Sequence, residues 1–88
     1  MIKLISASLV QDKILHLTFS DGSQGDLDMA TVLTRDTALT QPLALPEYFS
    51  RYFLELGALC WPDGLEFSAG SLHQKLEQAG SLRQSAAA

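Results

Sequence analysis

A cysteine, two histidines and a group of aspartates are the side chains of this sequence that could carry chemistry. Cys60 is the only cysteine, so one chain can form neither an internal disulfide nor a cysteine-based zinc site. A catalytic cysteine needs a lowered pKa, which a nearby cation or a helix N-terminus supplies. Cys60 lies between Leu59 and Trp61 in an apolar run, where burial raises a thiol pKa. We therefore interpret Cys60 as a small core side chain.

The histidines and aspartates allow a structural and a chemical interpretation. His16 falls on the polar side of an alternating run and His73 on an amphipathic segment, which predicts ordinary surface positions for both. Asp21, Asp26 and Asp28 lie within eight residues and could form a metal site or an acid–base pair. Their spacing does not match a calcium-binding loop.

Each of the outer two aspartates also has a structural role available, Asp21 in a turn and Asp28 as a helix cap. We predict no catalytic, metal or cofactor-binding residue and no enzymatic activity. A hydrolase or metal-dependent enzyme that uses Asp26, Asp28 or His16 is the alternative.

Aromatic residues provide the candidate interaction surface. Trp61 opens the sequence Trp-Pro-Asp-Gly, a turn signal, and is either a core side chain or a recognition residue. Tyr48, Phe49, Tyr52 and Phe53 are core residues by default, but a domain this small cannot easily bury them all. We predict an interaction surface at these residues: Tyr48, Tyr52, Trp61 and Asp63.

Strands and turns must position these residues in the first third of the chain. Residues 13–20 and 24–29 alternate apolar and polar side chains around Asp21-Gly22, which predicts a hairpin with a two-residue type I′ turn. A preceding strand is expected over residues 2–10, with a turn at Gln11-Asp12. Asp28 is expected to cap a short helix over residues 29–34, and residues 36–45 are expected to form a loop.

The second half of the sequence predicts a short helix, then strands, then a final helix. Pro46 favours a short helix over residues 46–51, followed by strands up to residue 61, although the aromatic spacing from Tyr48 to Leu56 also fits a helix. Ser68 is expected to cap a final helix with Leu72, Leu76 and Ala79 on one face, ending at Gly80.

The predicted fold class is α+β. We expect a single domain over residues 1–80, with an antiparallel sheet of four to five strands and two short helices, and a disordered tail over residues 81–88.

Length, composition and charge restrict the function classes. The 88 residues are 47% hydrophobic, enough for one core, and only 18% charged. A net charge of −4 with scattered basic residues disfavours direct nucleic-acid binding and suits a basic protein partner. Residues 4–10 are interpreted as a strand rather than a signal peptide, and no apolar run is long enough to span a membrane. We expect a protein of the reducing cytoplasm.

Three passages together resemble the small bacterial proteins of domain-of-unknown-function family 2442. Residues 14–28 (ILHLTFSDGSQGDLD) are similar to the family's strand, F-x-D-G turn and returning strand with an acidic end. Residues 48–53 resemble its aromatic segment, and residues 59–72 (LCWPDGLEFSAGSL) its W-P-[DN]-G turn and closing leucine. The resemblance covers about residues 4 to 75. The chain departs from it at Glu66-Phe67, where the family tends to place Asp before an apolar residue.

The resemblance implies a compact α+β fold and no established enzymatic activity, and we predict no cofactor. It also implies a partner, since family members are often encoded beside another small protein in the manner of a toxin–antitoxin pair. We predict an antitoxin-like interaction module that binds a small basic protein encoded nearby and can form a homodimer. The alternative is a small-molecule-sensing domain detached from the DNA-binding half that some relatives carry.

Overall fold

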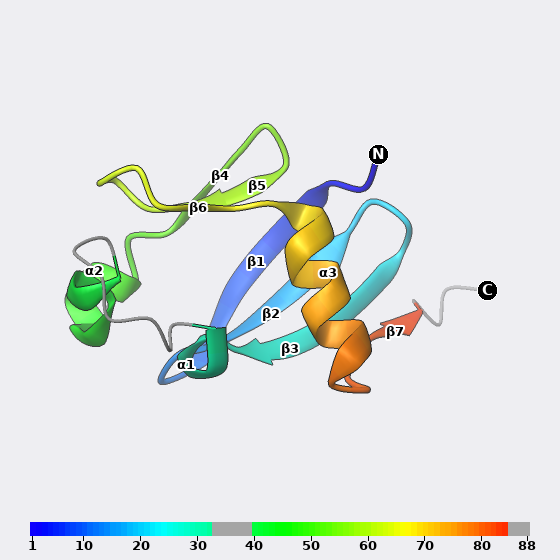
Figure 1. Cartoon of the computed structure of the whole chain (residues 1–88), viewed down its shortest axis with the longest axis horizontal. Coiled ribbons are helices and arrows are strands. Elements are labelled where there is room, and N and C mark those ends of the chain that lie inside the picture. The colour runs from blue at the N-terminus through cyan, green and yellow to red at the C-terminus, as the bar shows by residue number, and fades with distance from the viewer. Residues whose placement is uncertain (33–39, 85–88) are drawn as a thin grey trace.

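A computed structural model describes residues 1–32 and 40–84 of the chain and confirms the α+β class (Figure 1). It contains two antiparallel sheets and a few short helices. In chain order the elements are β1 (Leu4–Gln11), β2 (Ile14–Phe19), β3 (Ser23–Asp28), α1 (Met29–Val32), the 3₁₀ helix η1 (Gln41–Ala44), α2 (Pro46–Phe49), β4 (Phe53–Glu55), β5 (Ala58–Cys60), β6 (Glu66–Phe67), α3 (Ala69–Gln78) and β7 (Arg83–Gln84). No helix in these ranges is long and apolar enough to cross a membrane.

The larger sheet is antiparallel and has four strands, in the order β1-β2-β3-β7. Its antiparallel pairing and its first three strands agree with the prediction, whereas β7 lies in the predicted tail. Helix α3 crosses one face of this sheet (Figure 1). The core forms between them because alternate residues of the strands and every third or fourth residue of the helix point inward. Its buried side chains include Leu15, Leu17, Phe19, Leu27, Ala69, Leu72 and Leu76.

The hairpin of β2 and β3 forms at the predicted place but with a different turn. Thr18 pairs with Gln24, and the loop is formed by residues 20–22. Gly22 has a φ of +87° and donates its N–H to the Phe19 carbonyl at 3.0 Å, while Asp21 keeps a negative φ. A three-residue loop needs one left-handed residue, at its last position, whereas a type I′ turn needs two. The type I′ prediction at Asp21-Gly22 is therefore wrong.

The smaller sheet, in the order β4-β5-β6, is an element that the sequence did not predict as a separate sheet. Its strands are two or three residues long, too short to show a clear alternation. Leu59 on the central strand is fully buried, and Leu54 and Phe67 on its neighbours pack against the core. The division into a short helix followed by strands after Pro46 is confirmed, since α2 ends at Phe49.

Helix α3 begins and ends at the predicted residues. The Ser68 hydroxyl accepts a hydrogen bond from the Ser71 N–H at 3.2 Å. At the other end Gly80, with a φ of +71°, donates to the Glu77 carbonyl, and Ser81 donates to that of Leu76, a pair of bonds that ends a helix. Ala79 is exposed, contrary to the prediction, because it is the C-cap and lies after the last helical residue, Gln78.

Two boundaries differ from the prediction. Strand β1 continues to Gln11 and turns at Asp12-Lys13, one residue later than expected, because a register irregularity between Leu9 and Gln11 lengthens the strand. The chain after residue 80 also continues into the fold: β7 pairs with β3, and Leu82 packs against the core. The expected tail is thus structured as far as Gln84, and residues 85–88 lie outside the described ranges.

The expected helix after Asp28 is present as α1, where the Asp28 carboxylate accepts from the Ala30 N–H at 3.0 Å. Residues 33–34 of that predicted helix and 36–39 of the predicted loop lie outside the described residues. The rest of that loop contains η1, which buries Leu43.

Candidate functional site

Ser8, His16 and Asp26 form a row across the outer face of the larger sheet, where β2 brings His16 between the other two. His16 Nδ1 lies 2.6 Å from Asp26 Oδ1, and His16 Nε2 lies 2.9 Å from Gln24 Oε1. A Ser-His-Asp hydrolase needs the second ring nitrogen at the serine hydroxyl. Because His16 Nε2 contacts Gln24, His16 is not placed to act as a base on the Ser8 hydroxyl.

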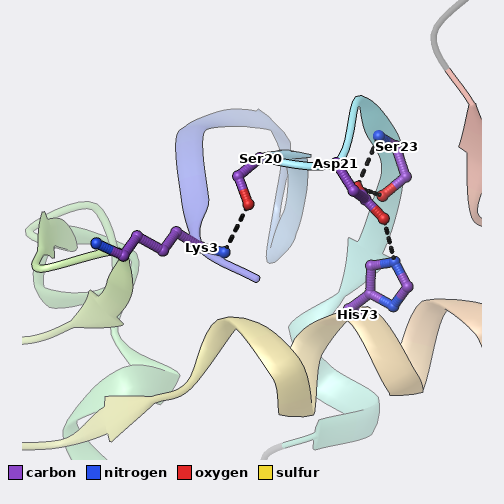
Figure 2. A network of polar contacts seen from close by, with 5 residues as sticks. All are labelled: Lys3, Ser20, Asp21, Ser23 and His73. Atoms are coloured by element: carbon purple, nitrogen blue, oxygen red, sulfur yellow. Dashed lines mark hydrogen bonds and ion pairs between the residues drawn. The ribbon is translucent and has the colours of Figure 1, made fainter. Parts of the chain in front are cut away.

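A second polar cluster joins Asp21 to Ser23 and His73 (Figure 2). Asp21 Oδ1 accepts from both the backbone N–H and the hydroxyl of Ser23, and Oδ2 lies 3.1 Å from His73 Nε2. These hydrogen bonds, above all the one from the Ser23 hydroxyl, lower the pKa of Asp21. The carboxylate lies between the serine and the histidine, so His73 has no contact through which it could activate Ser23. The cluster connects the hairpin loop to α3.

The three aspartates therefore have separate partners rather than a shared ligand. Asp21 binds the hairpin loop, Asp26 binds His16, and Asp28 caps α1. Across residues 1–32 and 40–84, no group of three His, Cys, Asp or Glu side chains could hold a metal ion.

The predicted interaction surface needs a correction at Trp61, which is buried rather than exposed. Its relative exposure is 1%, and its indole N–H donates to the Phe49 carbonyl at 3.0 Å. The rings of Phe49, Tyr52 and Phe67 surround it at centroid distances of 5.6, 6.4 and 6.0 Å. The large ring needs apolar surroundings and its N–H needs a buried acceptor. Phe67 of the smaller sheet supplies part of the first and the Phe49 carbonyl of α2 supplies the second, so Trp61 joins these two elements.

The other three predicted surface residues lie in α2, after it and in the turn that follows Trp61. Tyr48 and Tyr52 are half-buried and Asp63 is exposed. The Asp63 N–H donates to the Tyr48 hydroxyl at 3.1 Å, which holds the Trp61–Gly64 turn against α2. Partial burial, together with the Asp63 charge, raises the pKa of Tyr48. The structure thus links the four predicted residues: Tyr52 contacts the Trp61 ring, and Tyr48 binds Asp63 in the turn that Trp61 opens.

Next to this turn, the exposed face of the smaller sheet forms a shallow depression of about 260 Å³, which we name the acidic groove. Phe53 and Glu66 lie on either side of Cys60 in the sheet, and Glu55 is one residue pair further along. Trp61 and residues from the following turn complete the lining: Pro62, Gly64 and Leu65. The groove therefore combines an apolar wall with two carboxylates.

The electrostatics of the acidic groove are negative. The described residues contain two ion pairs, His16–Asp26 and His73–Asp21, so Glu55 and Glu66 have no cationic partner there. Burial, followed by the charges of Glu66 and Glu55, raises the pKa of Cys60. A protonated thiol is a poor nucleophile, and the same field attracts a positively charged group.

Sequence reasoning missed three residues of this groove. Phe53, expected in the core, is 42% exposed, and neither Glu55 nor Glu66 was predicted as a site residue. The signal was the alternation of Phe53, Leu54 and Glu55, which places Phe53 and Glu55 on the same face. Which face meets the solvent depends on where the strand packs.

Comparison with known proteins gives one match. A model of the family described as "Protein of unknown function (DUF2442)" matches residues 4–76. No curated protein and no solved structure matches the chain.

Proposed function

We propose a function for this chain, which belongs to the DUF2442 family of proteins of unknown function, from the geometry of its acidic groove. The chain acts as a non-enzymatic interaction module, the antitoxin-like member of a gene pair. It binds a basic segment of a small partner protein encoded nearby.

The observation that carries the proposal is the placement of two carboxylates, neither with a cationic partner among the described residues, beside an exposed aromatic ring. Glu55 and Glu66 lie on the same sheet face as Phe53, next to the apolar side chains Pro62 and Leu65. An arginine or lysine has an apolar stem and a cationic end. The stem fits the apolar wall, and the cation pairs with the carboxylates or stacks on the ring.

The surroundings of the groove extend the negative surface toward α2. Asp63 and Glu47 are exposed there, and Arg51 is an exposed cation beside Glu47. Tyr48 and Tyr52 contribute half-buried rings whose hydroxyl groups suit a partly wet interface. A basic protein that covers the groove would therefore meet both complementary charge and aromatic surface.

The test is co-expression with the protein of the adjacent gene, followed by size exclusion with light scattering. We expect the wild-type chain to form a complex and to relieve any growth arrest that the neighbour causes. The double variant Glu55→Lys/Glu66→Lys should weaken the complex at least about 100-fold, since two charge-assisted contacts are reversed. Circular dichroism checks that it folds.

Glu77→Lys is the matched control, because it reverses an exposed charge on α3, away from the groove. It should leave the complex unchanged. A wild-type chain that runs apart from its neighbour contradicts the proposal, and so does a double variant that binds as tightly as the wild type.

A further inference from the structure

The tip of the β4–β5 hairpin presents a leucine in a conformation that leucine rarely adopts. The strand register leaves two loop residues, Leu56 and Gly57, and their φ angles are +52° and +81°. This is the type I′ arrangement, in which Asn, Asp or Gly normally occupies the first position. A bulky residue in the left-handed region is strained, because its Cβ comes too close to the backbone carbonyl oxygen.

The Leu4 N–H holds the turn to β1 by donating to the Gly57 carbonyl at 2.9 Å, but burial of the Leu56 side chain does nothing to offset the strain. The Leu56 side chain is 94% exposed, so it gains no burial from its own fold. An exposed apolar side chain and a strained backbone at one residue are two independent disadvantages for an isolated monomer. Strain of this kind is often found at positions that contact another molecule.

An apolar depression of about 330 Å³ lies directly beside this leucine. The N-terminus and the hairpin tip lie on the same side of the molecule (Figure 1), and both line the depression together with the start of α3. Small residues line much of the depression, namely Ala58, Ala69 and Gly70, and Met1 and Ile2 add apolar surface. Leu56 and the apolar depression therefore lie next to each other on the surface.

We propose that this face mediates self-association: Leu56 of each chain inserts into the apolar depression of a second copy. A two-fold dimer requires a surface that carries both halves of the contact side by side, and this face does so. The inference goes beyond the proposed function, since it concerns the chain without its partner.

Charge complementarity supports a second copy as the occupant. Lys3 lines the apolar depression, and its side chain extends along the β4–β5 side, over Gly57 (Figure 2). Glu55 directly precedes the inserting leucine, and neither charge has an ion-pair partner among the described residues. Insertion of Leu56 into a second copy brings Glu55 of each chain toward Lys3 of the other.

The experiment is analytical ultracentrifugation of the isolated chain over a wide concentration range. We expect a weak, concentration-dependent dimer in the wild type. Leu56→Asn should raise the dimer Kd at least about 10-fold, since an inserted leucine is lost. In dilute protein it should instead raise the melting temperature, because asparagine tolerates the left-handed conformation. If Leu56 only stabilised the fold, its replacement would lower the melting temperature rather than raise it.

Three further variants make the test specific. Leu45→Asn, which removes another leucine that is 63% exposed, should leave the dimer unchanged. Gly70→Leu should weaken it by filling the apolar depression; a Cβ at Gly70 has no described neighbour closer than 3.9 Å. Glu66→Lys should change partner binding at the acidic groove but not self-association. A wild type that stays monomeric throughout, or a Leu56→Asn variant that dimerises like the wild type, overturns the proposal.

Discussion

Asp21 shows how a residue that could do chemistry can instead stabilise the fold. Its carboxylate holds the hairpin loop through Ser23 and reaches α3 through His73, a residue 52 positions away in the sequence. Because these contacts favour the ionised form, they also lower the pKa of Asp21. A pKa that differs between the folded and unfolded chain makes stability depend on pH.

We predict that Asp21→Asn lowers the melting temperature at neutral pH by about 2–4 °C. The folded-state pKa lies below the ordinary value of 3.8, so ionised Asp21 stabilises the fold above that value. The stabilisation is lost as the pH falls through the folded-state pKa. The difference between variant and wild type should therefore close as the pH is lowered from about 5 to below 3, measured by thermal melts followed by circular dichroism.

Glu77→Gln serves as the control for the pH series, since it neutralises an exposed carboxylate of α3 that makes no described ion pair. A difference for Asp21→Asn that stays constant at every pH would show that the charge of Asp21 contributes nothing.

At the scale of elements, the close approach of α3 to the larger sheet depends on a glycine of β3. A Cβ at Gly25 would lie 2.6 Å from the Ser81 carbonyl oxygen and 3.2 Å from a methyl group of Leu76. The backbone after α3 therefore passes directly over Gly25, which is possible only because glycine has no side chain.

We predict that Gly25→Ala destabilises the protein by about 2–3 kcal/mol, because the end of α3 must move away from β3. Urea denaturation gives the free energy of unfolding. Gly70→Ala is the matched substitution: its Cβ meets nothing closer than 3.9 Å, and alanine favours the helix, so stability should rise by up to about 1 kcal/mol. Equal effects of the two alanines would refute the steric explanation.

Several elements could be predicted because their signals are local. The alternation around Leu15 and Leu17, the cap at Ser68 and the stop at Gly80 each depend on a few neighbouring residues. The smaller sheet could not be predicted in this way. Its strands are too short to show a clear alternation, and their placement depends on side chains that pack against the core. The acidic groove on its exposed face could not be predicted for the same reason.

At the scale of the whole molecule, the last described strand, β7, forms one edge of the larger sheet. β7 pairs with Ser23 and Gln24, and Leu82 packs against the core beside it. The domain consequently extends beyond residue 80, where the sequence pattern predicted its end.

We predict that a chain ended after Gly80 is less stable than one ended after Gln84 by about 1.5–2.5 kcal/mol. The shorter chain loses the burial of Leu82 and the hydrogen bonds of β7. The two chains can be compared by their urea midpoints and by hydrogen exchange at the amides of β3. Equal midpoints, with equal protection of β3, would show that β7 adds nothing to the fold.

The sequence by itself determined the α+β class, the main hairpin, the caps of α1 and α3 and the family resemblance, because each of these depends on residues close together in the chain. Only the tertiary structure decided that Trp61 is buried, that Phe53 and Leu56 are exposed, and that Asp21 meets His73. A side chain's exposure depends on what packs over it, and in this protein the covering elements come from distant parts of the sequence.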